Sequence, residues 1–166
     1  MTEGKLAAVG RAAKMATIGA IKGVGDTAEA VLEASRDLLL TAIGGAGDVT
    51  TAAVGAVAKV IHGTIHAAKE SGEDVGLVAQ SAVRGAVKAA AETGADIGTV
   101  AVEAVQGAIR ATEEVGGDTG RVMKGAVRGA IAAAEEISTD AVKAVRNTLT
   151  TSVDGAKDVL SEPFKK

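Results

Sequence analysis

Residues 71–92 read SGEDVGLVAQSAVRGAVKAAAE, and the following blocks, 93–114 and 115–136, read TGADIGTVAVEAVQGAIRATEE and VGGDTGRVMKGAVRGAIAAAEE. The three blocks align without gaps, so the chain contains an internal repeat of 22 residues. A diverged fourth copy follows, and the aspartates that the four copies share are Asp74, Asp96, Asp118 and Asp140. The same step of 22 links a series of glycines, Gly63, Gly85, Gly107 and Gly129.

The repeat extends toward the N-terminus with one irregularity. Asp26 and Asp48 are also 22 residues apart, but the step from Asp48 to Asp74 is 26, which means that four residues are inserted between them. We therefore divide the chain into an N-terminal helical segment with irregular repeats (1–47), a repeat helix (48–160) and a C-terminal tail (161–166). Pro163 stops a helix in that tail.

The composition favours backbones that approach closely. Of the 166 residues, 47% are hydrophobic and 22 are glycine, but Phe164 is the one aromatic residue. Small side chains cannot fill wide gaps between elements, so a core of large interdigitating side chains is not expected. The charge is nearly balanced, with 18 basic and 21 acidic residues, which argues against a nucleic-acid partner.

The phase of the apolar residues favours an unbroken helix. Twenty-two residues make six turns at about 3.67 residues per turn, and steps of 4, 4 and 3 from Gly72 reach apolar or small residues almost throughout. A turn at each Gly-x-Asp has no reason to preserve that phase. We therefore predict an all-α fold, a long and nearly continuous helix in a straight or right-handed coiled-coil assembly of several helices. In this interpretation the chain does not reverse at 72–74, 94–96 or 116–118.

The alternative is a bundle of short helices. Glycine after a helix and aspartate at an N-cap are stop and start signals, and each Gly-x-Asp supplies both. Glycine inside a helix also costs roughly 1 kcal/mol relative to alanine, and this chain has many glycines.

The residues on the 4-4-3 track are the predicted helix–helix packing residues. They combine Gly-x-x-x-Gly pairs, which permit close helix approach, with pairs of larger apolar residues. The set is Gly72, Gly76, Val83, Val87, Gly94, Gly98, Val105, Ile109, Gly116, Gly120, Val127, Ile131, Leu149 and Val153.

The apolar face is too broad for one isolated helix to bury, which predicts a homo-oligomer of four or more helices or a filament. Acidic and basic bands alternate along the polar face, as Glu70, Arg84, Glu92 and Arg110 illustrate. Neighbouring chains are therefore expected to be offset by about eleven residues, or to run antiparallel, so that acid meets base.

The chain offers few residues for chemistry. It lacks cysteine, tyrosine and tryptophan, and its two histidines are His62 and His66. At spacing i, i+4 the two histidines can reach one metal ion. They align by the repeat, however, with Arg84 and Lys88 on the polar face. Glu70 is the one further side chain nearby in the sequence that could act as a ligand. We therefore predict no catalytic residue, no metal site and no cofactor, and we expect the protein not to be an enzyme.

The segments SGEDVG, TGADIG, GAVRGAVKAAAE and GAIRATEE resemble the uncharacterised bacterial hendecad-repeat coiled-coil proteins. This resemblance implies right-handed, self-associating helices and a structural role. GAVAKVIHGTIHAAKE is more weakly similar to the 11- and 22-residue lipid-surface helices of synucleins and apolipoproteins, which implies an amphipathic coat on a membrane, lipid droplet or storage granule. No signal peptide is apparent, so we expect a cytoplasmic location. In the lipid-coat alternative, the protein lies at the surface of a membrane or granule.

Overall fold

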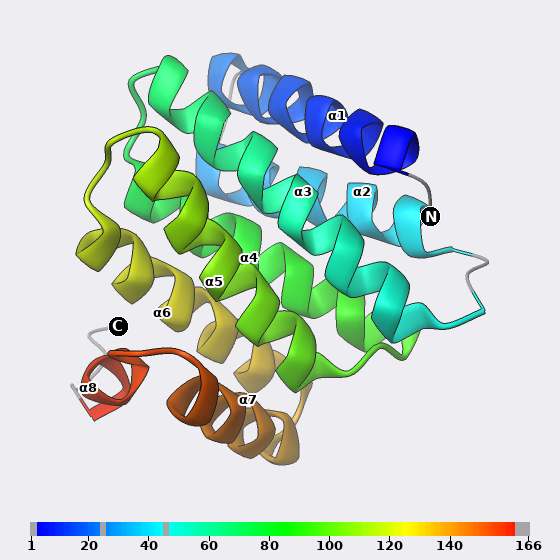
Figure 1. Cartoon of the computed structure of the whole chain (residues 1–166), viewed down its shortest axis with the longest axis vertical. Coiled ribbons are helices and arrows are strands. Elements are labelled where there is room, and N and C mark those ends of the chain that lie inside the picture. Colours follow the sequence, from blue (N-terminus) through cyan, green and yellow to red (C-terminus); the bar gives the residue numbers. More distant parts are fainter. Residues whose placement is uncertain (1–2, 24–25, 45–46, 162–166) are drawn as a thin grey trace.

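The computed structural model describes residues 3–23, 26–44 and 47–161, and over these residues it consists of α-helices joined by short turns, with no strand (Figure 1). The predicted all-α class is confirmed. The described residues form helices α1 (Glu3–Lys22), α2 (Thr27–Ile43), α3 (Val49–Glu70), α4 (Val75–Thr93), α5 (Ile97–Glu114), α6 (Thr119–Ile137), α7 (Thr139–Ser152) and α8 (Ala156–Ser161).

Successive helices run in opposite directions and alternate between two layers. The layers are α1, α3, α5 and α7 on one side and α2, α4 and α6 on the other (Figure 1). Within a layer the helices are parallel, because Thr50 at the start of α3 accepts a hydrogen bond from the amide of Asp96, the N-cap of α5, while His62 further along α3 contacts Glu114 at the end of α5. This arrangement is a helical-repeat stack, in which each unit packs against its neighbours.

The predicted long continuous helix is wrong. The chain reverses at 72–74, at 94–96 and at 116–118, between α3 and α4, α4 and α5, and α5 and α6. At each reversal a glycine has left-handed backbone geometry, with φ of 73° at Gly72, 81° at Gly94 and 71° at Gly116. L-residues rarely adopt this geometry, and it cannot belong to a right-handed helix.

The turn between α4 and α5 shows how each Gly-x-Asp acts. The amide of Ala95 donates to the carbonyl oxygen of Ala90 at 3.0 Å, a 6→1 bond that closes the end of α4. Asp96 then accepts a hydrogen bond from the amide of Thr99 at 3.2 Å and caps the start of α5. Stop and start signals thus act together, as the alternative of short capped helices predicts.

The inserted four residues extend a helix. α3 is 22 residues long, against 19 in α4 and 18 in α5, and it begins directly after the N-cap Asp48. Gly45 and Ala46, in the middle of the segment 44–48, lie outside the described residues, as do 162–166 of the predicted tail.

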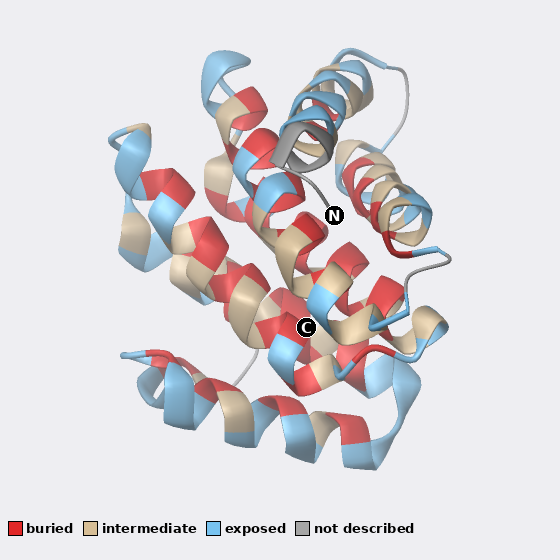
Figure 2. Ribbon diagram, turned by 45° about the vertical axis from the view of Figure 1, so that its right-hand side comes forward, coloured by how far each residue is buried: buried red, intermediate tan, exposed pale blue. Residues whose placement is uncertain are grey.

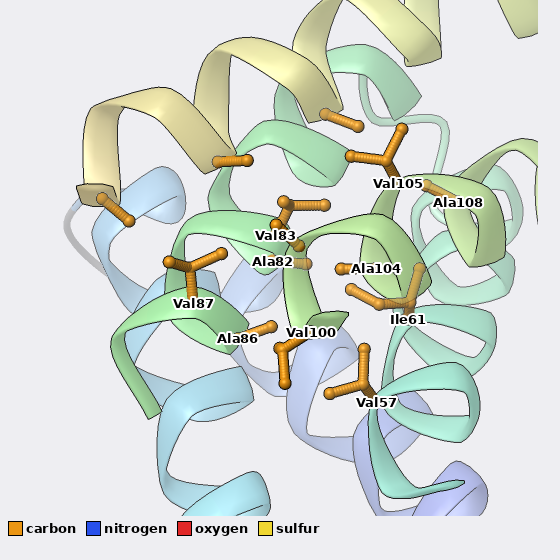
Figure 3. Close-up of a cluster of buried hydrophobic side chains, with 14 of the residues drawn as sticks. Val57, Ile61, Ala82, Val83, Ala86, Val87, Val100, Ala104, Val105 and Ala108 are labelled. Carbon is orange, nitrogen blue, oxygen red and sulfur yellow. The ribbon is translucent and has the colours of Figure 1, made fainter. Parts of the chain in front are cut away.

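The core consists mainly of alanine and valine side chains and lies between the two layers (Figure 2). α3, α4 and α5 contribute to one continuous cluster, which Figure 3 shows around Val57, Val83 and Val105. One chain therefore buries the broad apolar face that we expected to need other chains, because each inner helix contacts helices of its own layer and of the other layer.

Glycine sets the spacing within each layer. A Cβ at Gly85 of α4 would collide with the carbonyl oxygen of Leu32 in α2, and one at Gly129 of α6 would collide with that of Gln80 in α4. Gly63 of α3 meets the backbone of α1 in the same way. These close approaches use glycines from the middle of α3, α4 and α6, whereas a Cβ at the equivalent Gly107 of α5 would lie 3.8 Å from Cα of Ala58, an ordinary contact.

Candidate functional site

A repeated ion pair joins helices of the same layer. A basic residue in the middle of one helix contacts a glutamate near the end of the second helix after it. The four pairs are Lys14–Glu70, Arg36–Glu92, His62–Glu114 and Arg84–Glu136. The glutamates are 22 residues apart, so all four pairs occupy one position of the repeat, and we call them the ion-pair series.

The pair at His62 differs from the others because histidines take the place of the lysine or arginine that contacts the glutamate. Nε2 of His62 lies 2.7 Å from Oε2 of Glu114, and Nε2 of His66 lies 3.1 Å from the same oxygen. The two imidazole rings, one turn apart on α3, have centroids 4.2 Å apart. Glu114 comes from the last position of α5, so the cluster joins two helices that are distant in sequence.

The partners of Glu114 and of Glu136 stabilise the ionised form of these two carboxyl groups. Hydrogen bonds from His66 and His62 hold the pKa of Glu114 below its ordinary value. In the equivalent pair of the other layer, Lys88 and Arg84 lower the pKa of Glu136 in the same way. His62 and His66 thus stand where the next repeat has Arg84 and Lys88, as the sequence alignment indicates.

Two shallow grooves leave the histidine cluster accessible from solvent. One, of about 180 Å³, is bordered by His62 and Glu114 together with Lys59 and Arg110. The other, of about 260 Å³, is bordered by both histidines and by residues of α1. Three ligand atoms, one from each of His62, His66 and Glu114, lie within 4.8 Å of one another, so the cluster has the donors for a metal ion.

The predicted helix–helix packing residues fall into two groups. Most lie in the interior: Gly76, Val83, Val87, Gly98, Val105, Val127, Ile131, Leu149 and Val153 are buried, and Ile109 is half-buried. The exposed members are Gly72, Gly94, Gly116 and Gly120. The first three form the turns, and a Cβ on any of them would meet nothing within 4 Å, so they do not mediate close helix approach.

The predictions from sequence missed the meeting of Glu114 with His62 and His66. A signal was present in the period of 22 that links Glu70, Glu92 and Glu114. That signal becomes a contact because the chain reverses twice between α3 and α5 and makes them neighbours.

The two edges of the odd-numbered layer differ in polarity. On α1, Gly10, Lys14 and Thr17 face α3. On the opposite side of the helix, the exposed Arg11 and Lys22 lie beside a row of exposed residues without charge. We call these residues the α1 edge: Ala8, Ala12, Met15 and Gly19. The outer side of α7 is polar instead and exposes Lys143, Arg146, Asn147 and Thr150.

The fold and the ion-pair series define a helical-repeat protein built on one helix and one turn per 22 residues. No family model, curated protein or solved structure matches the chain. The resemblance to hendecad-repeat proteins therefore stays a prediction. Within the described residues, no helix combines the length and the apolar character needed to cross a bilayer.

Proposed function

We propose that the protein is a structural protein without catalytic activity, and that it assembles with copies of itself through the α1 edge. The observation that carries the proposal is the exposure of this edge. Met15 at its centre is 68% exposed, the largest value among the large hydrophobic residues that the structure leaves exposed. The edge runs over about three turns of α1, and Arg11, one turn before Met15, is the charged residue exposed along it.

The α1 edge corresponds to a surface that is buried in the next helix of the layer. α3 uses the equivalent side, which includes Gly63 and Ala67, to pack against α1. In α1 that side has no helix before it among the described residues. Ala8, Ala12 and Gly19 are small, Met15 supplies apolar area to bury, and the edge of another copy offers the same residues.

The proposed assembly is a closed pair of chains. The outer side of α7 presents Lys143 and Arg146, which do not match the apolar α1 edge, so head-to-tail growth into a filament is disfavoured. The alternation of acid and base, from which we predicted an axial offset between chains, is used between helices of one chain, for example between Arg36 and Glu92. A pair of α1 edges related by twofold symmetry needs no such offset.

Light scattering coupled to gel filtration tests this proposal on the full chain. We expect the mass of two chains at micromolar concentration, and the mass of one chain for Ala12→Glu/Met15→Glu, because a buried unpaired carboxylate opposes association. Thr150→Glu on the exposed side of α7 is the matched control and should keep the wild-type mass. A wild-type protein that is monomeric at every concentration contradicts the proposal.

An amphipathic coat on a lipid surface is the second candidate. It is favoured by the basic character of α1, in which Arg11 and Lys22 are exposed on the same helix as the α1 edge. Sedimentation with anionic vesicles separates the two candidates. A chain that is monomeric in buffer, binds the vesicles and loses binding in Ala12→Glu/Met15→Glu supports the coat and contradicts the assembly.

A further inference from the structure

We propose that His62, His66 and Glu114 form a binding site for a divalent transition-metal ion of the Zn²⁺ class, which would link α3 to α5. This site is separate from the α1 edge and does not depend on how copies of the chain associate.

The arrangement of donors carries the proposal. Two histidines at i and i+4 on one helix face are a recurrent pair of zinc ligands, and here both Nε2 atoms point to one carboxylate oxygen from a second helix. Zinc bonds of 2.0–2.1 Å in a tetrahedron place ligand atoms roughly 3.3 Å apart. The observed separations of 2.7 Å and 3.1 Å between nitrogen and oxygen are a few tenths of an ångström shorter. A widening of that size needs small side-chain rotations, which the half-exposed His62 and Glu114 have room to make.

Comparison with the equivalent pair shows what the histidines change. In the other layer, Lys88 and Arg84 contact Glu136 and carry permanent positive charge at neutral pH. A histidine pair instead presents ring nitrogens, which can bind a metal ion as guanidinium and ammonium groups cannot. Neutral imidazoles beside an ionised carboxylate are the form in which these groups bind a metal ion.

Other charges near the cluster are mostly engaged elsewhere. Arg110 contacts Glu103 at 3.1 Å, and Lys14 contacts Glu70 at 2.7 Å, which reduces the repulsion between these cations and a bound metal ion. Lys59 and Arg11 border the grooves as well. They favour a water molecule or a small anion at the open coordination position.

The nature of the donors selects the class of metal. Imidazole nitrogen with one carboxylate suits Zn²⁺, Ni²⁺, Co²⁺ and Cu²⁺, whereas Mg²⁺ and Ca²⁺ prefer sites made of oxygen ligands. We therefore expect the cluster to bind Zn²⁺ and to leave Mg²⁺ unbound at the same concentration.

Titration calorimetry of the untagged full chain with Zn²⁺ measures the site directly. We expect one ion per chain, no heat of binding with Mg²⁺, and a tetrahedral visible spectrum when Co²⁺ replaces Zn²⁺. The ion should also raise the Tm, because it binds the folded chain in preference to the unfolded one. A wild-type chain without saturable Zn²⁺ binding overturns the proposal.

The repeat supplies a matched control. His62→Arg/His66→Lys installs the pair found at Arg84 and Lys88, which keeps the contact with Glu114 and removes both nitrogen ligands. We expect Zn²⁺ affinity to fall at least about tenfold in this variant and in Glu114→Gln, with unchanged helical content by circular dichroism. Affinity equal to wild type in the folded His62→Arg/His66→Lys variant would show that the ion binds elsewhere.

The reverse substitution tests whether the geometry of the repeat is sufficient. Arg84→His/Lys88→His places a histidine pair opposite Glu136 in the other layer. We expect this variant to bind two Zn²⁺ ions per chain. If it folds and still binds one, the argument from the repeat geometry fails. The mass measured by light scattering without metal reports the α1 edge and should be the same in all these variants.

Discussion

Arg36 in α2 and Glu92 in α4 form a two-pronged ion pair, with 2.8 Å between Nε and Oε2 and 2.6 Å between Nη2 and Oε1. The hydrogen bonds that Arg36 donates to Glu92 raise the pKa of the guanidinium. The planar guanidinium matches the carboxylate with two parallel bonds, which a lysine ammonium cannot do. The pair fixes the position of α4 along α2, and the ion-pair series repeats this constraint in both layers.

We expect Arg36→Lys to lower the urea midpoint of unfolding only slightly, because both side chains are partly exposed and water screens the pair. Urea denaturation followed by circular dichroism measures the change. Glu113→Gln, an exposed acid of α5 outside the ion-pair series, serves as control with a change within about 0.5 kcal/mol. A fall in the urea midpoint as large as that of Gly85→Ala would mean that the pair is much less screened than its exposure indicates.

Gly85→Ala should destabilise the fold by about 1 to 3 kcal/mol, because the added methyl group collides with the carbonyl oxygen of Leu32 and forces α2 away from α4. Gly19→Ala is the matched control: it lies inside α1 with nothing within 4 Å of the new Cβ. There alanine should stabilise the helix by about 0.5 to 1 kcal/mol. Denaturant midpoints of the two variants should therefore move in opposite directions, and a shift in the same direction would contradict the observed helix spacing.

The fall in the free energy of unfolding at acidic pH should depend on Glu114 and Glu136. Their pKa values are lower in the folded chain, so each contributes stability that is present above the ordinary glutamate range and is lost as pH falls through the folded pKa. We expect the free energy of unfolding of the wild type to exceed that of Glu114→Gln at pH 6, measured with a chelator present. The difference should shrink steadily as pH falls below about 4.3. A difference that stays constant from pH 6 to pH 2.5 would show that the carboxylate charge is irrelevant.

Much of the local structure can be predicted from the sequence. The period of 22 and the helical class follow from residue types and their spacing, and the capping role of Asp74 and Asp96 follows from the alternative of short helices, which the sequence analysis did not favour. The breadth of the apolar face also follows, because two adjacent stripes such as those through Val83 and Ala82 cannot lie on a narrow seam.

The chain reversals could not be decided from the apolar pattern. Glycine is compatible with that pattern as a small core residue, so the sequence analysis placed Gly94 in the interior of a helix. In the structure this residue is exposed and has left-handed backbone geometry. Interior and turn glycines differ in φ, which the sequence does not show. The approach of His62 to Glu114, 52 residues away, depends on two such reversals, and for that reason the sequence analysis left the histidines without their third ligand.

Gly116→Ala and Gly120→Ala distinguish the two folds that the sequence allows. In the continuous-helix assembly both glycines belong to one Gly-x-x-x-Gly packing pair, so alanine should have a similar effect at the two positions. In the observed fold Gly116 lies in the turn after α5 and has φ of 71°. Alanine there should lower the free energy of unfolding by about 1 to 2 kcal/mol because of this backbone geometry. Steric contact does not contribute, since nothing lies within 4 Å of the added Cβ. Gly120 lies in the first turns of α6, where a Cβ would be 3.5 Å from Oδ1 of Asp118, an ordinary contact, so alanine should be neutral or stabilising. Thermal and urea unfolding of the two single variants measures the contrast, and stabilisation by Gly116→Ala would contradict the chain reversal at 116–118.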